Sequence, residues 1–447
     1  MKILLINPPF KGEKKHKHAP LGLYYISEYI KDIADVKVFD CNVNNSNVFD
    51  IAEKMEPDII GISVLTPTVK SSINLLKILK EKNDRCLFVA GGIHASSFPD
   101  DMIFAGFDLV IRGEGELTFY ELVTRFDSNK IYEIDGISFL DKTNRKVIHR
   151  KDRKRIKNLD MLGFPKLSKN ELEYYEYASI ITSRGCAYQC YYCSSSYYWN
   201  KIVKTRSIES ILCEINYYLS LGVEHIYFCD DNFFSNPQIV KNLCKKIIEH
   251  KLKFKWNALI RLDLLNEETL ELMKLAGCTC LSIGIECGSK EVLQREKGLS
   301  IETLIEKFFL IKKVGIYTRT TWMIGMGNNY EEEQKSAELM KILMPNQISI
   351  HMLIPYPNTL AWERPERYNL IINKKNIDYD VFTTTFSPKL LEEVRYKHLT
   401  ANQIKSLIKY FKAEMKSLGY SDAQEVNKNK YKIIESFLDD EVIPMIF

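Results

Sequence analysis

Short apolar runs alternate with amphipathic stretches over the first 130 residues of this 447-residue chain. The apolar runs are rich in Ile, Val and Leu and predict strands, whereas the stretches between them repeat apolar positions at helical spacing. The predicted strands cover residues 3–6, 36–39, 59–64, 87–90 and 109–111, and the predicted helices cover 21–31, 48–55, 69–82 and 99–105. This alternation predicts a Rossmann-like, doubly wound parallel sheet with helices on both faces.

The alternation returns with a longer repeat from residue 178. Predicted strands cover 178–182, 225–229, 254–258, 279–285, 317–324 and 347–353, and predicted helices cover 208–221, 237–250, 267–275, 301–314 and 330–343. Asn266, followed by two glutamates, predicts the start of one helix, and Gly277 predicts its end. Six strand and helix units predict a partial (β/α)6 barrel, so the chain is expected to be an α/β protein with chemistry at the carboxyl ends of its barrel strands.

Two parts of the chain lie outside both strand-and-helix alternations. Residues 136–140 and 146–148 predict a hairpin, and the polar stretch 150–176 predicts a crossing between domains with a solvated charged surface. Beyond residue 360 only 390–398 and 403–418 have helical spacing, which predicts a mainly helical C-terminal region. The expected domains are a sheet domain at 1–130, a hairpin and linker at 131–176, a barrel at 177–360, and a cap that meets the substrate at 361–447. The aromatic residues of that last part fit a small satellite core equally well; they are Trp362, Tyr368, Tyr379, Phe382 and Phe386.

Composition excludes several classes of function. A formal net charge of +4 is small for this length, so charge indicates no nucleic-acid or membrane-surface role. Eleven cysteines without paired spacings favour a reducing compartment. The first apolar run is too short for the core of a signal peptide, and no run is long enough to span a bilayer. A cytoplasmic location is therefore expected.

The candidate chemistry begins in a loop with three cysteines, Cys186, Cys190 and Cys193, at the spacing C-x-x-x-C-x-x-C. Three thiolates are one short of the four that usually close an iron-sulfur cube, so a cluster held here keeps one iron open to a ligand. A zinc site is the alternative. Zinc needs a fourth protein ligand, and the nearest candidates, Cys213 and His225, lie on a predicted helix and at a strand start.

This loop resembles the signature of the radical S-adenosylmethionine (SAM) enzymes, with an aromatic residue, Tyr192, before the third cysteine. Five further motifs occur in the order typical of cobalamin-binding radical SAM proteins. They are Pro8-Pro9, Pro20-Leu21-Gly22-Leu23, Gly91-Gly92-Ile93-His94, Arg112-Gly113-Glu114-Gly115-Glu116 and Asn158-Leu159-Asp160-Met161-Leu162-Gly163-Phe164-Pro165. The resemblance covers about residues 1–360. It implies a Rossmann-like cobalamin domain joined to a radical SAM barrel, with a 4Fe-4S cluster, SAM and cobalamin as cofactors.

The resemblance also implies which barrel residues bind SAM. Carboxylates after the second strand are expected at the SAM ammonium, Arg261 at a carboxylate, and Glu286 at the ribose or amino group. The expected SAM-binding residues are Tyr192, Asp230, Asp231, Asn232, Arg261, Glu286 and Met323. One alternative is that Arg261 and Glu286 form an ion pair between strands. Another is a second cluster at Cys278, Cys280 and Cys287, although small buried thiols are also common in cores.

Glycines and polar residues follow the strands of the first sheet, where such sheets bind their ligands. The expected cobalamin-binding residues are Pro8, Leu65, Thr66, Gly91, Gly92, His94, Gly113 and Glu114. None of the eight histidines has an Asp two residues before it, so the axial-histidine motif D-x-H-x-x-G is absent. Leu65 and Thr66 are therefore expected to face the cobalt without ligating it strongly, and His94 to lie near the nucleotide tail.

Simpler interpretations of these residues remain open. Gly91-Gly92 fits a tight turn, His94 a solvated or capping histidine, and Glu114 with Glu116 a helix start. From the residues alone, the ligand at this edge could equally be a nucleotide, a flavin or another tetrapyrrole, and the domain could have lost its cofactor.

The resemblance implies a reaction in which a 5'-deoxyadenosyl radical removes hydrogen from an unactivated carbon that then receives a methyl group from cobalamin. Rearrangement, ring formation or carbon-carbon coupling is the rival reaction, with cobalamin absent or not carrying methyl, and a non-enzymatic carrier is a further alternative. The expected partners are an electron donor such as flavodoxin or ferredoxin and a substrate that is a small metabolite, a lipid or a peptide.

Overall fold

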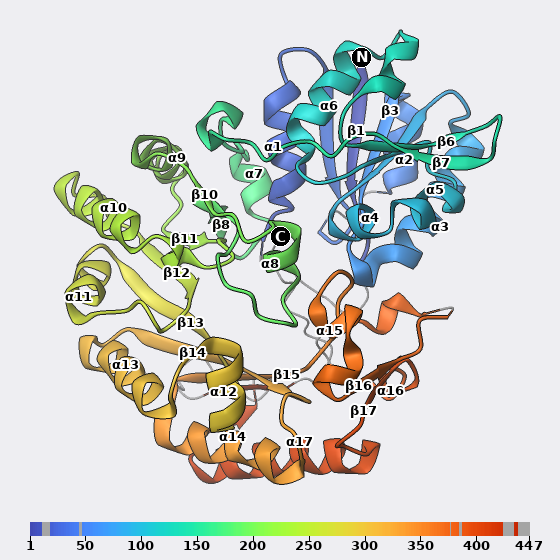
Figure 1. Cartoon of the computed structure of the whole chain (residues 1–447). Helices are drawn as coiled ribbons and strands as arrows, with labels where there is room; N and C mark the ends of the chain where they lie inside the picture. The colour runs from blue at the N-terminus through green and yellow to red at the C-terminus, as the bar shows by residue number, and fades with distance from the viewer. Residues whose placement is uncertain (11–17, 44–46, 376, 384–386, 423–432, 437–447) are drawn as a thin grey trace. The chain divides into compact units, whose positions relative to one another are not determined.

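The computed structural model describes residues 1–10, 18–43, 47–375, 377–383, 387–422 and 433–436 (Figure 1). The chain divides into two compact units. Unit 1 comprises Met1–Ala178 with Lys204–Ser210, and unit 2 comprises Ser179–Val203 with the described residues from Ile211 onward. In this part of the chain, no helix combines the length and apolarity that a membrane crossing requires.

Unit 1 is built on a seven-stranded sheet in the order β2-β1-β3-β4-β5-β6-β7. Its strands are β1 (Lys2–Asn7), β2 (Asp35–Asp40), β3 (Ile59–Ser63), β4 (Leu87–Gly91), β5 (Leu109–Ile111), β6 (Ile137–Asp141) and β7 (Lys146–His149). The first five pair in parallel, and this confirms the predicted doubly wound sheet. The predicted hairpin forms as β6 and β7, and β6 pairs antiparallel with β5, so the hairpin extends the sheet.

Helices cover both faces of this sheet. They are α1 (Leu21–Ile30), α2 (Val48–Met55), α3 (Val69–Lys82), α4 (Ile93–Ser97), α5 (Pro99–Ala105), α6 (Gly115–Thr124) and α7 (Lys169–Leu172), with short 3-10 turns at η1 (Thr66–Thr68), η2 (Asn129–Glu133) and η3 (Leu159–Leu162). The short strand β10 (Lys204–Thr205) also belongs to unit 1. Helices α4 and α7 were not predicted, and α6 begins at Gly115, as the simpler interpretation of Glu114 and Glu116 as a helix start expects.

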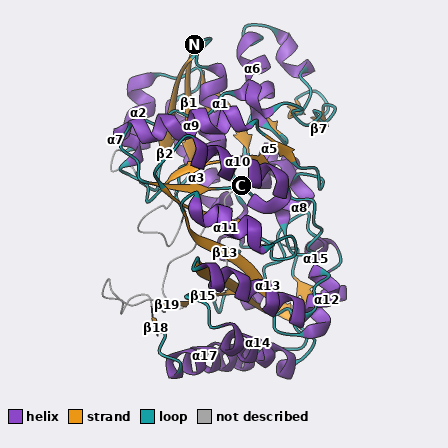
Figure 2. Cartoon of the chain, turned by 90° about the vertical axis from the view of Figure 1, so that its left-hand side faces the viewer, coloured by secondary structure: helices purple, strands orange, loops and turns teal. Residues whose placement is uncertain are grey.

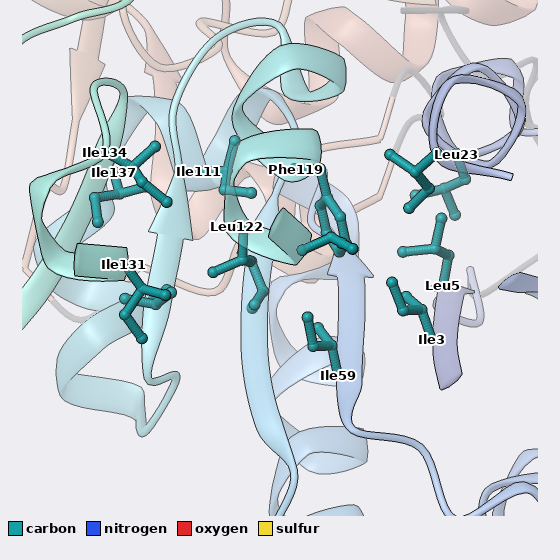
Figure 3. Close-up of a cluster of buried hydrophobic side chains, with 14 residues drawn as sticks. Ile3, Leu5, Leu23, Ile59, Ile111, Phe119, Leu122, Ile131, Ile134 and Ile137 are labelled. Carbon is teal, nitrogen blue, oxygen red and sulfur yellow. The ribbon is translucent and has the colours of Figure 1, made fainter. Parts of the chain in front are cut away.

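The core of unit 1 explains why its strands are apolar at successive positions. Ile3 and Leu5 pack with Leu23 of α1 and Phe119 of α6 on one face of the sheet (Figure 3). Leu4 and Ile6, which alternate with them and point to the opposite face, are fully buried too. Strands buried on both faces read as continuous Ile, Val and Leu runs, as in other parallel sheets covered by helices.

Unit 2 contains an eight-stranded sheet in the order β18-β19-β15-β14-β13-β12-β11-β8. Its strands are β8 (Ala178–Ile180), β11 (His225–Phe228), β12 (Lys255–Ile260), β13 (Cys278–Glu286), β14 (Tyr317–Ile324), β15 (Gln347–Met352), β18 (Ser421–Asp422) and β19 (Ile433–Ser436). The first six lie side by side in chain order, as the predicted partial barrel requires. Strand β19 adds to β15 in parallel and was not predicted.

Helices follow the strands of unit 2 in sequence, visible in Figure 2 as purple elements beside the orange sheet. They are α8 (Ser194–Tyr198), α9 (Ile208–Ser220), α10 (Pro237–Glu249), α11 (Glu267–Leu275), α12 (Lys290–Lys297), α13 (Ile301–Val314) and α14 (Tyr330–Leu343), with η4 (Phe233–Ser235). Asn236, Asn266 and Asn329 begin three of them, because each side chain accepts a hydrogen bond from a first-turn backbone N–H. The predicted helix start at Asn266 is therefore confirmed.

The C-terminal region departs from prediction at one point. It contains α15 (Leu360–Glu363), η5 (Pro365–Tyr368), β16 (Leu370–Ile372), η6 (Tyr379–Val381), α16 (Leu390–Glu393), β17 (Val394–Tyr396) and α17 (Ala401–Ser417). The predicted helix over 390–398 is wrong after its first turn, because residues 394–396 pair antiparallel with β16 and bury alternate side chains. Trp362 and Phe382 are buried against each other and Tyr379, as in a satellite core. Phe386 lies outside the described residues.

Candidate active site

The three-cysteine loop leaves the barrel at the carboxyl end of β8, runs through β9 (Ser183–Arg184) and ends at α8. Asp230, two residues after the end of β11, holds the start of the loop. Its carboxylate accepts hydrogen bonds from the Thr182 hydroxyl at 2.8 Å, the Ser183 hydroxyl at 2.6 Å, and the Ser183 backbone N–H. Burial raises the pKa of Asp230 to about 6. This carboxylate is committed to the loop, so its predicted contact with the SAM ammonium gains no support here.

Asp231 closes the same loop. Its carboxylate accepts from the Gly185 N–H at 2.8 Å and from the Ser195 hydroxyl, so it ties together two points ten residues apart on either side of the cysteines. Gly185 has a φ of +100°, and a side chain there would clash with the carbonyl of Ile202. One carboxylate and one glycine thus fix the shape of the loop.

The three thiols are close enough to influence one another. Burial raises the pKa of Cys186 to about 11 and that of Cys193 to about 12, and the charge on Cys190 adds to both shifts. Three thiolates in this largely buried loop would repel one another. The positive charge of an iron-sulfur core would stabilise them, so the three residues fit a cluster. Among the described residues, these three cysteines included, no three or more His, Cys, Asp or Glu side chains are grouped as a site for a metal ion. The cluster assignment therefore rests on the type and spacing of the three thiols.

Arg261 and Glu286, at the ends of β12 and β13, do not pair with each other. Arg261 Nε lies 3.1 Å from Asp263 Oδ1, whereas Glu286 Oε1 lies 3.3 Å from Lys297 Nζ. The alternative of an ion pair between Arg261 and Glu286 is therefore wrong. Arg261 also donates from Nη1 to Cys190 Sγ at 3.5 Å, so the structure brings it to the cysteine loop.

Glu286 sits at an irregular strand end. The register of β13 against β14 shifts between Gly284 and Glu286, and Glu286 has a φ of +75°. Such backbone is uncommon for a residue with a side chain and clusters at functional sites. Lys297, at the end of α12, donates to the Gly284 carbonyl and faces the Glu286 carboxylate. Sequence reasoning missed Lys297, because a lysine in the last turn of a helix ordinarily serves the helix dipole.

Tyr192 and Asn232 complete this part of the barrel. Burial raises the pKa of Tyr192 well above its usual value, and the charges of Cys190 and Glu286 add to the shift. Asn232 is buried, and its Oδ1 accepts from the Arg261 backbone N–H at 3.2 Å. Its Nδ2 has no acceptor among the described residues.

Two remaining predictions concern more distant residues. Met323 lies half-buried on β14, opposite His351 of β15. Cys280 lies early on β13 and Cys287 just beyond its end, a separation of roughly 20 Å at the rise of a strand. These two thiols are therefore too far apart to share a cube, and the second-cluster alternative is wrong.

In unit 1, the predicted cobalamin-binding residues fall at the carboxyl ends of β1, β3, β4 and β5. Gly92 has a φ of +95°, and a Cβ added there would lie 2.9 Å from the carbonyl oxygen of Val64, so only glycine fits. His94 is buried, with Nδ1 3.3 Å from Thr66 Oγ1, and its backbone N–H donates to the Val64 carbonyl. Burial lowers the pKa of His94 to about 3, so the ring is neutral. His94 thus fixes the loop after β3, and its contact with a nucleotide tail stays a prediction.

The loop residues themselves are tightly bonded. The Leu65 N–H donates to Thr68 Oγ1 at 3.0 Å, and the buried Pro8 offers its carbonyl to Asn42 at 3.0 Å. Glu114 accepts from Arg155 Nε at 3.1 Å and from the Ile156 N–H at 2.8 Å. Glu114 therefore anchors the linker, and no observation here supports its contact with a ligand.

Open space borders two glycines of this edge. Within the part of the chain that the structure describes, a Cβ added at Gly91 or at Gly113 would meet no atom within 4 Å. Gly113 has a φ of +75°, but Gly91 does not need a glycine for its backbone. Nothing among the described residues therefore explains the missing side chain at Gly91, and an edge that leaves backbone bare at this point fits the close approach of a large flat ligand such as cobalamin.

Sequence comparison identifies the same two parts. The model of the B12 binding domain matches residues 11–123, and that of the radical SAM superfamily matches residues 180–340. The chain is 30% identical over 427 residues to a protein of Pyrococcus horikoshii named uncharacterized methyltransferase PH0819, covering 92% of this chain and 91% of that one.

Two more distant relatives differ in their named reactions. The chain is 26% identical over 383 residues to the anaerobic magnesium-protoporphyrin IX monomethyl ester cyclase of Rubrivivax gelatinosus, covering 80% of this chain and 68% of the relative. It is 25% identical over 388 residues to the hopanoid C-3 methylase of Methylococcus capsulatus, covering 82% and 73%.

Two solved structures share the fold. One is the radical SAM methyltransferase TsrM from Kitasatospora setae with cobalamin and a 4Fe-4S cluster bound, with a TM-score of 0.71, 20% identity, and coverage of 84% of this chain and 81% of that one. The other is the cobalamin-dependent radical SAM enzyme OxsB with aqua-cobalamin and SAM bound, with a TM-score of 0.76, 18% identity, and coverage of 96% and 69%. With both domains matched in order and a relative aligned over nine-tenths of its length, the chain belongs to the cobalamin-binding radical SAM enzymes.

Proposed function

We propose that this enzyme methylates an unactivated carbon of its substrate. The observation that carries the proposal is the presence, in one chain, of a three-thiol barrel loop fixed by Asp230 and Asp231 and a B12-type sheet edge left bare at Gly91. Relatives named as methyltransferases or methylases support the same reaction. The relative aligned over 91% of its length is one of them.

The proposed roles follow from the contacts of each residue. Cys186, Cys190 and Cys193 would hold the cluster, and Tyr192 and Glu286 would bind SAM. When bound, the cluster and SAM supply the radical that removes hydrogen, and cobalamin supplies the methyl group. The chain's own task is to keep water from the radical and to hold the substrate carbon still.

Ring formation is the second candidate function, because one relative is named a cyclase. The two reactions differ in what they consume. Methyl transfer uses two SAM molecules per turnover, giving one S-adenosylhomocysteine and one 5'-deoxyadenosine with methionine. A ring-forming or rearranging reaction gives 5'-deoxyadenosine without a matching amount of S-adenosylhomocysteine.

The deciding experiment is an anaerobic reconstitution with iron, sulfide and cobalamin, supplied with methyl-labelled SAM, a reductant and fractionated cell extract. We expect a labelled product in the mass spectrum, with S-adenosylhomocysteine and 5'-deoxyadenosine in about equal amounts. Deoxyadenosine that rises with product, with no S-adenosylhomocysteine and no label in any product, would reject methyl transfer in favour of the second candidate.

The proposed setting is a reducing compartment with a one-electron donor. All eleven cysteines are free of disulfides, which supports such a compartment, and we retain the cytoplasm as the proposed location. A flavodoxin or ferredoxin is the proposed donor, because reductive cleavage of SAM needs electrons one at a time. The substrate class, whether small metabolite, lipid or peptide, is the question that the labelled-product search answers.

A further inference from the structure

Arg261 is held in one position by three contacts that do not involve the cysteine loop's thiols. Nε donates to Asp263 Oδ1 at 3.1 Å, and Nη2 donates to the Lys297 carbonyl at 3.0 Å. The guanidinium carbon lies 3.6 Å from the centre of the Tyr188 ring, so the cation stacks on an aromatic face. The Tyr188 hydroxyl in turn donates to Asp263, which closes the arrangement. A side chain anchored on three sides loses little further entropy when it makes a fourth contact.

The fourth contact is to a cluster thiol. Arg261 Nη1 lies 3.5 Å from Cys190 Sγ and donates to it, and the arginine side chain is only 11% exposed. A permanent cation therefore touches one of the three sulfurs through an N–H···S bond, in a place where water screens it weakly.

We propose that Arg261 sets the reduction potential of the cluster through this N–H···S bond to Cys190. The proposal rests on the cluster of the proposed function and is independent of methyl transfer. Adding one electron from an external reductant makes the cluster more negative by one charge, and a hydrogen bond and a cation at its sulfur stabilise that reduced state more than the oxidised one. Arg261 therefore makes the cluster easier to reduce.

Asp263 offers a control substitution that should shift the potential in the opposite direction. Its carboxylate lies on the Nε side of the guanidinium, beyond the edge that faces Cys190, and it opposes part of the arginine's field. Removing the arginine charge and removing the aspartate charge must therefore move the potential in opposite directions. A change that merely loosened the fold would move both variants the same way.

The test uses the full chain reconstituted with iron and sulfide, with neither SAM nor substrate present. Titration with titanium citrate, followed by the electron paramagnetic resonance signal of the reduced cluster, gives the potential of each variant. For Arg261→Met we expect a more negative potential, with at least a tenfold loss in the reduction equilibrium, which is about 59 mV for one electron. Arg261→Lys keeps the charge but loses the planar fork and should fall between Arg261→Met and the natural protein. For Asp263→Asn we expect a more positive potential.

Iron and sulfide contents per chain establish that each variant holds an intact cluster. An Arg261→Met potential equal to or above that of the natural protein overturns the proposal, and so does a shift of the same sign in Arg261→Met and Asp263→Asn. If Arg261→Met assembles no cluster, the sign of the Asp263→Asn shift decides alone, a positive shift supporting the proposal and any other result rejecting it. Expected shifts in a chain that transfers no methyl group would support this proposal and count only against the proposed reaction.

Discussion

The two adjacent glycines at the end of β4 can be substituted one at a time to tell a glycine required for folding from one required for ligand binding. Gly92→Ala places a side chain on a backbone with φ of +95° and ψ of 178°, a region that is essentially restricted to glycine. Its Cβ would also lie 2.9 Å from the Val64 carbonyl oxygen and 3.1 Å from the Val64 nitrogen. Gly91→Ala differs in both respects, because its Cβ meets no atom of the described residues within 4 Å and its φ is not positive.

The expected magnitudes follow from these geometries. A strained φ costs on the order of 1–3 kcal/mol, and a backbone contact too close to relax adds a similar amount, so Gly92→Ala should lower the free energy of unfolding by about 3 kcal/mol. Gly91→Ala should change it by less than about 1 kcal/mol, with a small gain expected because alanine restricts the unfolded chain. Its effect should instead fall on the ligand, since the new methyl group occupies the bare edge.

The assays are urea unfolding of the cobalamin-free protein and an optical titration with hydroxocobalamin. We expect Gly91→Ala to unfold at the same urea concentration as the unsubstituted protein. We also expect it to bind cobalamin at least tenfold more weakly. If a normally folded Gly91→Ala protein binds cobalamin as tightly as the unsubstituted protein, the placement of cobalamin at this edge is refuted. If Gly92→Ala is as stable to urea as the unsubstituted protein, the structural argument for that glycine is refuted.

Three further predictions concern the cofactors. Replacing Cys186, Cys190 and Cys193 together with alanine should abolish the absorbance of the cluster and the cleavage of SAM, and retained cleavage would place the cluster elsewhere. Bound cobalamin should be base-off without nitrogen superhyperfine coupling in its electron paramagnetic resonance spectrum, whereas strong coupling to a histidine nitrogen would contradict the absence of an axial histidine. Lys297→Met should leave the iron content unchanged but weaken SAM binding at least tenfold, because Glu286 loses its cation; unchanged SAM affinity by equilibrium dialysis would show that Glu286 needs no such support.

The sequence predicted where polar residues gather but not with which atoms they pair. Asp230 and Asp231 were correctly expected at the end of a barrel strand, because strand ends follow from the apolar pattern. Their partners in the cysteine loop depend on how a stretch some 45 residues earlier folds back, and no local pattern encodes that. Lys297 was missed for the same reason, since what buries it is the irregular end of β13.

Short strands were hard to predict for a related reason. Residues 394–396 follow a helical turn and are strand only because β16 pairs with them, so their local pattern favoured helix. The hairpin at 137–149 was predicted from its own sequence, but its addition to the edge of the first sheet depends on β5, some 26 residues away. The long periodic helices and the hairpin were predicted from their own residues, whereas β17 and β19, which a distant partner sets, were not.

The irregular end of β13 shows how the barrel keeps a strained residue at the end of a strand. A φ of +75° at Glu286 costs on the order of 1–2 kcal/mol for a residue with a side chain, and a regular strand would avoid it. Lys297 offsets this cost by holding both the Gly284 carbonyl and the Glu286 carboxylate, while its own carbonyl receives Arg261. One lysine at a helix end thus fixes the glutamate proposed to meet SAM and the arginine proposed to tune the cluster. Because Lys297 meets Glu286 with its side chain but Arg261 with its backbone carbonyl, Lys297→Met should lower SAM affinity and leave the Arg261 contact in place, whereas a change at Asp263 should disturb chiefly the cluster potential.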